Sequence, residues 1–176
     1  MTLSLMLKRT ILFITIVVIW ALVVAMARAS TAERAVVAFP GFSPGTIVVK
    51  TAERRLYYVL DGGRALSFPV GVGRSGMTWT GSARVDGKYV QPAWSPPEDI
   101  RRDHPELPEV IAGGARNNPM GAAALTLNGG DYAIHGTNRP GSIGGFVSYG
   151  CIRMYNHDIV ELYRLVDIGT PVIVER

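Results

Sequence analysis

Short apolar runs separated by tight glycine turns dominate the sequence from Thr46 to Val90. The clearest case joins the runs 55–60 and 65–72 through Asp61-Gly62-Gly63. A turn of aspartate and glycine between β-branched and aromatic runs is a strong β-hairpin signal. Since no helical periodicity interrupts these runs, we predict antiparallel β structure for this half of the chain.

Two further hairpins are expected on the same grounds. In the first, 81–85 and 88–90 flank Asp86-Gly87; in the second, 122–127 and 131–135 flank Asn128-Gly129-Gly130. The second strand of the last hairpin would end at His135.

A single helical pattern occupies the C-terminal part of the chain. Asn156 has the side chain of a good N-cap, and Asp158 would lie in the first turn, where the helix dipole favours negative charge. Apolar residues then recur at spacings of three and four, at Ile159, Leu162, Tyr163 and Val166. Gly169 would stop this helix, and 171–174 is expected to be a closing strand. The chain is therefore predicted to be mostly β with one short helix.

The stretch 91–119 differs from the rest because prolines fall among charges and glycines. Such a composition is expected to sustain neither a regular helix nor a central strand. Trp94, Ile100 and Leu107 supply apolar anchors, so we predict a partly ordered flap beside an active cleft. A mobile surface linker is the alternative.

The only cysteine, Cys151, follows a glycine and stands sixteen positions after His135. No intramolecular disulfide can form, and an adjacent imidazole would raise the thiolate fraction of a thiol whose ordinary pKa is about 8.5. A glycine bend can present the sulfur at a cleft, with the N–H groups of Gly150 and Cys151 as oxyanion donors. We predict a cysteine nucleophile with its base. A buried, unreactive core cysteine is the alternative.

The stretch from His135-Gly136-Thr137 to Ser148-Tyr149-Gly150-Cys151 resembles the L,D-transpeptidase catalytic domain (YkuD type) of bacterial cell-wall enzymes. The family pattern is a histidine, a loop, and then Ser/Thr-His-Gly-Cys. Tyr149 departs from it, and Trp79 stands where the family often has proline. The resemblance covers roughly 46–174 and implies an antiparallel, sandwich- or barrel-like β fold.

The resemblance also implies the chemistry. Cys151 would form a thioester with a peptidoglycan tetrapeptide stem, cut between the L-centre of its third residue and the terminal D-alanine. His135 would be the general base, oriented through the backbone of Gly136. The acyl group would pass to the side-chain amine of a diamino acid on a neighbouring stem, giving a 3→3 cross-link.

Four residues around the nucleophile are candidates for substrate binding. Arg153 would hold a stem carboxylate bidentately; a structural ion pair with an acid such as Asp158 is the alternative. Tyr149 would line the acceptor side or only pack. Ser148 and Gly150 complete the set, and Ser148 also suits a local bond from side chain to backbone.

The first 29 residues have the pattern of an export signal and are left out of the fold prediction. Lys8-Arg9 precedes an apolar run, and Ala27-Arg28-Ala29 fits a small-x-small cleavage site. The mature chain would begin at Ser30 in the periplasm. An uncleaved anchor is the alternative, which would give inner-membrane contact through this segment only. The expected division is a signal at 1–29, a short linker at 30–45 and the catalytic domain at 46–176.

Charge and ligand spacing argue against other partners. The formal net charge of +4 reflects 18 Lys and Arg against 14 Asp and Glu. Loss of Lys8, Arg9 and Arg28 with the signal takes the basic count from 18 to 15, which leaves a net charge of about +1. No basic run is interleaved with aromatic residues, so we expect no nucleic-acid partner. Three scattered histidines and one cysteine predict no metal site, and no cofactor is expected.

Three functions stand at this stage. The first is the transpeptidase, whose acceptor is a stem peptide or a lysine of an outer-membrane lipoprotein. The second is a hydrolase that uses the same residues to pass the acyl group to water. The third is a wall-binding β module in which Cys151 is unreactive.

Overall fold

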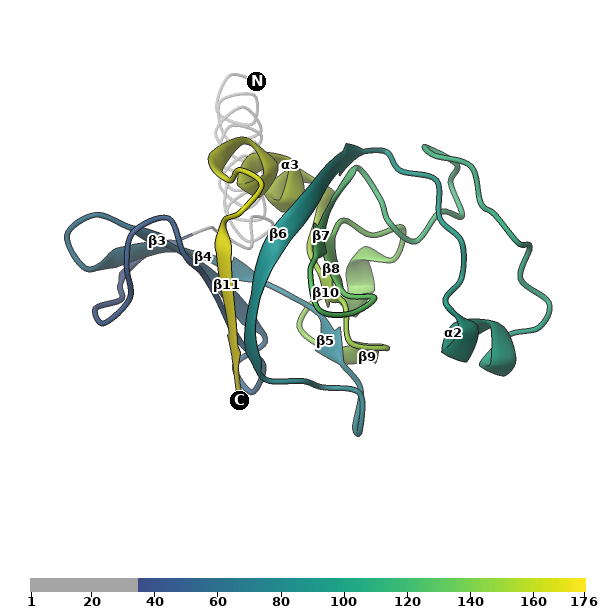
Figure 1. The fold of residues 1–176 in the computed structure, drawn as a ribbon, viewed down its shortest axis with the longest axis horizontal. Helices are drawn as coiled ribbons and strands as arrows, with labels where there is room; N and C mark the ends of the chain where they lie inside the picture. The colour runs from purple at the N-terminus through teal and green to yellow at the C-terminus, as the bar shows by residue number, and fades with distance from the viewer. Residues whose placement is uncertain (1–34) are drawn as a thin grey trace, which may run out of the picture. The chain divides into compact units, whose positions relative to one another are not determined.

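The fold is that of a computed structural model which describes residues 35–176 (Figure 1). The predicted export signal lies outside the described residues. Within 35–176, no helix is long and apolar enough to cross a membrane. The strands are β1 Ala35–Ala38, β2 Ile47–Lys50, β3 Arg55–Leu60, β4 Arg64–Pro69, β5 Val72–Gly73, β6 Gly81–Val90, β7 Ala123–Leu127, β8 Ala133–His135, β9 Phe146–Ser148, β10 Ile152–Arg153 and β11 Pro171–Glu175. The helical segments are α2 Glu98–Asp103, the 3-10 turn η1 Pro140–Ser142 and α3 Asn156–Leu165.

In this part of the chain, nine strands form one sheet in the order β1-β4-β3-β2-β11-β6-β7-β8-β10, and β5 pairs with β9. The predicted hairpins β3–β4 and β7–β8 are both antiparallel. At the β3–β4 turn, Gly62 and Gly63 have φ of 73° and 67°, which glycine adopts without the steric cost of a Cβ. The mostly β prediction is confirmed, with α3 after the cysteine as expected.

The sheet is mixed, however, where antiparallel pairing alone was expected. β11 enters between β2 and β6, parallel to β2 and antiparallel to β6. β10 is parallel to β8, and β5 is parallel to β9. These parallel neighbours are distant in sequence, so no turn pattern signals their pairing.

Residues 81–90 form one long strand and not the predicted hairpin. β6 continues through Asp86-Gly87, with a register shift between Val85 and Gly87 that marks a bulge. A Cβ on Gly87 would lie 2.6 Å from both Thr126 Oγ1 and the Tyr89 ring. This glycine therefore permits close packing at the bulge instead of making a turn.

Three smaller expectations also differ from the structure. The proline-rich stretch does contain a helix, the six residues of α2, with Pro97 at its N-cap, where a missing N–H costs nothing. Tyr155, not Asn156, is the N-cap of α3, and that helix ends at Leu165, ahead of Gly169. Part of the expected linker, Ala35–Ala38, forms β1, which pairs with β4.

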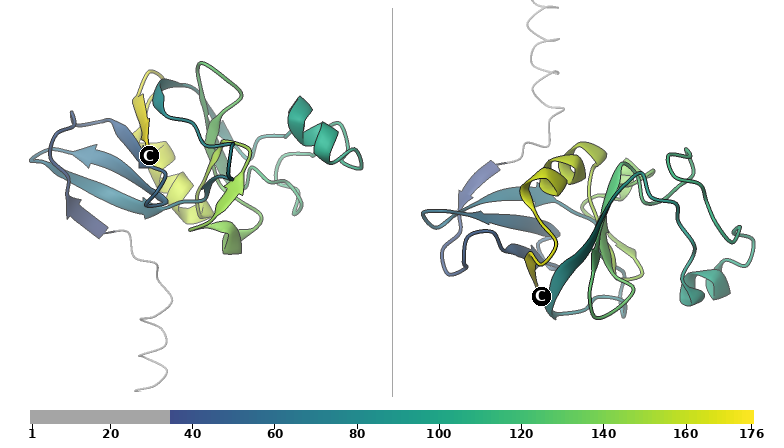
Figure 2. Two further views of the ribbon diagram at one scale, coloured as in Figure 1. Left: turned by 90° about the horizontal axis from the view of Figure 1, so that it is seen from below. Right: turned by 45° about the horizontal axis from the view of Figure 1, so that its top comes forward.

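The main core lies between the sheet and α3. Ile159 and Leu162 of the helix are fully buried against strand residues such as Leu125 and Ile134. α3 contacts β7 and β8, the hairpin that carries His135. Figure 2 shows the proline-rich segment with α2 projecting beyond the β10 side of the sheet. The core thus fixes the strands that bear the candidate site, and the flap extends from them.

Candidate active site

Adjacent parallel strands bring the candidate residues together. β8 ends at His135, and its neighbour β10 places Arg153 directly beside it in register. Because side chains alternate along an extended chain, Cys151 and Arg153 share one face. All three side chains line one cavity of about 550 Å³.

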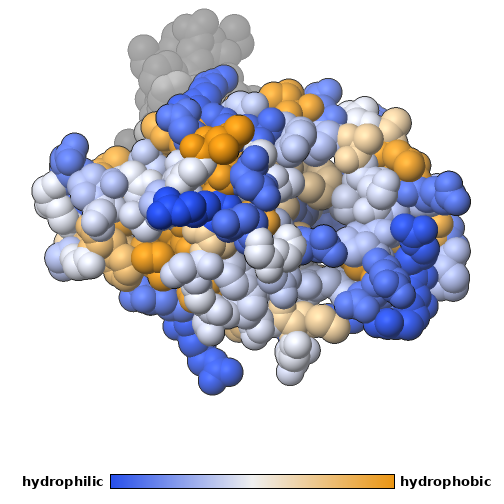
Figure 3. Space-filling model, viewed as in Figure 1, coloured by the Kyte–Doolittle hydropathy of each residue, from blue (hydrophilic) through white to orange (hydrophobic). Residues whose placement is uncertain are grey.

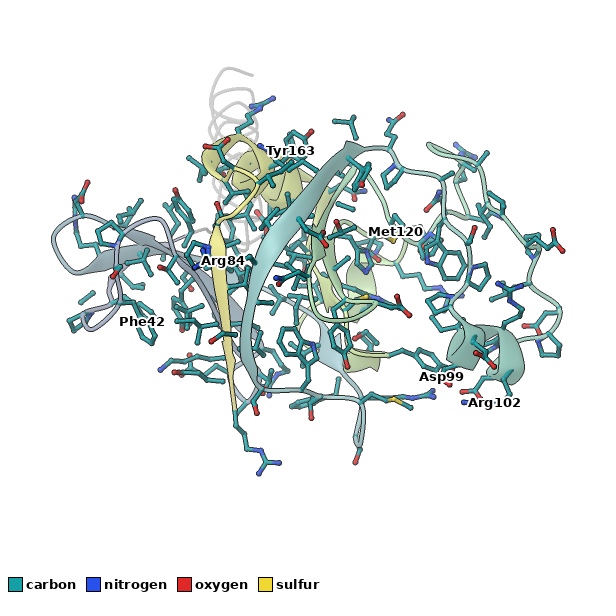
Figure 4. The ribbon with its side chains drawn as sticks, viewed as in Figure 1. Phe42, Arg84, Asp99, Arg102, Met120 and Tyr163 are labelled. Carbon is teal, nitrogen blue, oxygen red and sulfur yellow. The ribbon has the colours of Figure 1, made fainter. Side chains whose placement is uncertain are left out.

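The proline-rich flap forms the opposite wall of this cavity. Trp94, Pro96 and Ile100 line it from the flap, and Met120, labelled in Figure 4, lines it where the chain returns to the sheet. Figure 3 shows the surface hollowed between the sheet and the flap, whose outer side is strongly hydrophilic over α2. The predicted placement of the flap beside the cleft agrees with this geometry. Leu107 lines a second, neighbouring cavity instead.

The base of the flap is fastened by one buried side chain. The Asn118 amide donates to the carbonyl oxygens of Pro92 and Ala112, each at 2.9 Å, and its Oδ1 accepts from the Met120 N–H at 2.9 Å. These bonds join the two ends of the flap, so its anchoring does not depend on apolar contacts alone.

The imidazole of His135 is held in one tautomer. Its Nδ1 lies 2.7 Å from the Gly136 carbonyl oxygen. A carbonyl only accepts, so Nδ1 carries the proton and the Nε2 lone pair is available as a base. Burial chiefly, and then the charge of Arg153, lower the pKa of His135 to about 4, against the opposing effect of the Gly136 and Pro119 carbonyls. The ring is therefore neutral at pH 7.

The thiol of Cys151 is also neutral at rest. Burial raises the pKa of Cys151, and this outweighs the lowering by a backbone hydrogen bond at Ala133 and by the charge of Arg153. The sulfur donates weakly to the Asp131 carbonyl oxygen at 3.8 Å. The expected increase in thiolate is thus corrected: a thiol faces a neutral base, and the proton must move as the sulfur attacks.

The glycine before the cysteine is required by its surroundings. Gly150 has φ of 120°, and a Cβ there would lie 2.4 Å from the Tyr132 ring. Trp79 stacks on Tyr132 with 4.8 Å between ring centroids and donates from Nε1 to the Gly150 carbonyl at 3.0 Å. The sequence analysis did not assign Trp79 or Tyr132 to the site. The only signal was the departure of Trp79 from the family's proline.

Ser148 holds the turn together. Its buried hydroxyl accepts from the Gly150 N–H at 3.1 Å and donates to the Cys151 carbonyl at 2.6 Å. The Gly150 N–H is therefore occupied, which corrects its expected role as an oxyanion donor. The Cys151 N–H stays as the candidate.

Asn156 fixes the backbone on either side of the hairpin that carries His135. Its Oδ1 accepts from the backbone N–H groups of Ala122 and Thr137, at 3.1 and 3.0 Å. These two segments flank β7 and β8, so the amide fixes the backbone that follows His135. Because Asn156 fitted an N-cap, sequence analysis missed this role.

Arg153 and Tyr149 have different surroundings. Arg153 Nε is buried and has no hydrogen-bond partner, and among residues 35–176 the expected alternative pairing with Asp158 is not formed. The Tyr149 hydroxyl donates to Asp103 Oδ2 of α2 at 2.6 Å, and its ring lies 3.9 Å from the Arg74 guanidinium. Tyr149 therefore ties the flap to the sheet as well as lining the cavity.

The domain is thus mostly β, and at one sheet edge a buried imidazole and a partly exposed thiol line the same cavity. The family model of the L,D-transpeptidase catalytic domain matches residues 44–174. The chain belongs to this family, which confirms the resemblance inferred from the sequence.

Curated relatives carry corresponding names. The chain is 39% identical over 135 residues to the probable L,D-transpeptidase YbiS of Escherichia coli K12, covering 72% of this chain and 43% of that protein. The probable L,D-transpeptidase ErfK/SrfK of the same organism is 41% identical over 135 residues, covering 72% and 42%. The chain thus spans less than half the length of these relatives.

Solved structures of the family share the fold. An L,D-transpeptidase from Mycobacterium smegmatis aligns with a TM-score of 0.60 at 21% identity, covering 74% of this chain and 58% of that one. The Enterococcus faecium catalytic domain acylated by ertapenem aligns with a TM-score of 0.58 at 22% identity, covering 77% and 100%. These matches confirm the predicted fold class.

Proposed function

We propose that this domain is an L,D-transpeptidase that transfers the acyl part of a peptidoglycan tetrapeptide stem through a thioester on Cys151. The observation that carries the proposal is that Cys151 and His135 line one cavity, in which burial keeps the imidazole neutral and the Gly136 carbonyl holds its proton on Nδ1. Family membership supports the reaction class.

The proposed first half-reaction begins with attack of the Cys151 sulfur on the carbonyl carbon before the terminal D-alanine. The thiol proton passes to Nε2 of His135, and the Cys151 N–H stabilises the oxyanion. The C–N bond then breaks, Nε2 returns the proton to the departing amine, and D-alanine leaves. The acyl group stays on the sulfur as a thioester.

In the second half-reaction, the side-chain amine of a diamino acid on a neighbouring stem attacks the thioester carbonyl. The amine loses its proton to Nε2, the thiol regains it, and a 3→3 cross-link is released. In this scheme Gly136 is a positioning residue, Ser148 and Gly150 shape the turn, and Arg153 and Tyr149 face the substrate.

The place of action follows from the substrate. We propose that the pattern in residues 1–29 exports the chain to the periplasm, where peptidoglycan stems are its partners. A lysine of an outer-membrane lipoprotein is an alternative acceptor, since it presents the same primary amine.

Muropeptide analysis of purified wall material, treated with the protein or with its Cys151→Ala variant, tests the proposal. We expect 3→3 dimers and free D-alanine with the wild type and neither with the variant. Release of D-alanine without dimers would make the domain a carboxypeptidase. No change with either protein would contradict acyl transfer and favour the wall-binding module.

A further inference from the structure

Arg153 is a partly buried cation two residues after the nucleophile, and the proposed proton transfers do not use it. It lines the catalytic cavity together with Cys151 and lies in register with His135. Its Nε is buried without a partner, and among the described residues its guanidinium forms no ion pair. Because a buried Nε–H without a partner is unfavourable, and a guanidinium bonds most strongly to an anion, this arrangement favours an anionic ligand.

The second of the two cavities around Arg153 has the electrostatics of an anion site, whereas Asp86 and Asp131 also line the catalytic cavity. Arg153 lines both the catalytic cavity and a second cavity of about 390 Å³. Arg139 adds another positive charge to the second cavity, whereas Arg74 there is already paired with Asp103 at 2.9 Å. Glu106 is the acid among the lining residues, and it is bonded to a neighbouring histidine. Two amide side chains, Asn117 and Asn138, complete the polar lining.

Family membership and the proposed reaction narrow the anion to a carboxylate of the wall peptide. We propose that the Arg153 guanidinium binds the terminal carboxylate of the D-amino acid that leaves the donor stem. The inference rests on the proposed function and deepens it.

The spacing of the two residues suits this ligand. Cα atoms two residues apart on an extended strand are about 7 Å apart, with both side chains on one face. In a tetrapeptide donor, the terminal carboxylate lies about 4 Å from the scissile carbonyl carbon. One stem can therefore meet the Cys151 sulfur and the Arg153 guanidinium together. A planar guanidinium donates to both oxygens of a carboxylate, whereas a C-terminal amide offers it only one acceptor oxygen.

The most direct test measures the binding of donor peptides to a variant that cannot form the thioester. In the Cys151→Ala background, calorimetry would compare three donors: the tetrapeptide free acid, its C-terminal amide, and a peptide amidated on the side-chain carboxylate of the diamino acid. We expect the free acid to bind about 10- to 100-fold more tightly than the C-terminal amide. Addition of Arg153→Gln should bring this ratio close to one.

Two further variants separate recognition from folding. Arg153→Lys keeps the charge without the fork, so it should give an intermediate ratio. Arg164→Gln removes an exposed charge from the outer face of α3 and should leave the ratio as in the parent. Melting temperatures of all variants would identify any that fail to fold.

A ratio that Arg153→Gln leaves unchanged would overturn the inference. The inference would also be overturned if Arg153 were needed to distinguish the free acid from the peptide amidated on the diamino acid's side chain, and not from the C-terminal amide. Since Cys151→Ala forms no thioester, this ratio is read independently of turnover. Failure of the proposed acyl transfer would show in the muropeptide analysis instead.

Discussion

The neutral imidazole of His135 links the site to stability. Its pKa is about 4 in the folded domain, below the ordinary value of 6.5. Between these values the unfolded chain binds more protons, so the stabilising effect is present above pH 6.5 and is lost as the pH falls toward 4. The difference corresponds to about 3 kcal/mol.

We therefore predict a steeper pH dependence of unfolding free energy for the wild type than for His135→Gln between pH 4 and 6.5. Urea denaturation of both proteins across this range measures it. Other titrating groups are common to the two proteins and cancel in the comparison. Parallel curves would show that His135 is not held neutral by burial.

The backbone at Gly136 is packed too closely to leave room for a side chain. A Cβ there would lie 2.3 Å from Asn156 Oδ1 and 2.9 Å from the Ala122 N–H nitrogen. We predict that Gly136→Ala displaces the backbone that orients the imidazole, costing about 2 kcal/mol of stability and at least tenfold in acylation rate. Chemical denaturation and acylation kinetics would measure both.

Gly141→Ala is the matched control for this change. Gly141 has nothing within 4 Å of the position that a Cβ would occupy, so the substitution should be nearly neutral. Equal effects of the two substitutions would contradict the steric argument.

Among the structural elements, α2 depends on a latch made by Arg74, Tyr149 and Asp103. Asp103 pairs with the guanidinium and accepts from the phenol, and together these partners lower the pKa of its carboxyl. We predict that Asp103→Asn speeds hydrogen exchange in α2 and leaves the midpoint of global unfolding nearly unchanged, since the latch is exposed. Hydrogen-exchange mass spectrometry would localise the change.

Asp99→Asn provides a control on the same helix. Figure 4 shows Asp99 beside Arg102, and these two side chains pair within α2 instead of across to the sheet. Loss of that pair should leave the docking of α2 unchanged. Comparable exchange in both variants would argue that Asp103 does not fasten the flap.

The elements also show what could be predicted from the sequence. The hairpins around Gly62-Gly63 and Gly129-Gly130 were predictable because turn and strands are local. The bulge at Asp86-Gly87 was mistaken for a turn because the same dipeptide serves both structures. Only contacts across the sheet decide between them, and those are formed by residues of β7.

The candidate site was predictable only in part. His135 and Cys151 were chosen from residue type and the long family pattern, and they do line one cavity, while their catalytic roles stay predictions. The hydrogen bonds of Trp79 and Asn156 could not be predicted from the sequence, since each joins segments that are far apart in the chain. The protonation state of the thiol was expected wrongly because burial, which the sequence does not show, raises its pKa.

At the scale of the whole domain, the last strand, β11, connects the two parts of the large sheet. β11 joins the β2–β3–β4 part of the sheet to the β6–β7–β8 part, and α3 packs under the latter. β8, which ends at His135, and β10, which begins directly after Cys151, are thus held by one core. The flap, fastened by the Asn118 bonds and the latch, adds the other wall. A sheet edge held by the core, with a separate flap as its cover, suits the proposed reaction, in which two large wall peptides enter in turn.

Intact-protein mass spectrometry after mixing with a tetrapeptide donor tests the central claim most directly. The account predicts an adduct on Cys151 equal to the donor without its terminal D-alanine, formed more slowly in His135→Gln and absent in Cys151→Ala. An unmodified wild-type protein under turnover conditions, or an adduct that persists in Cys151→Ala, would contradict it.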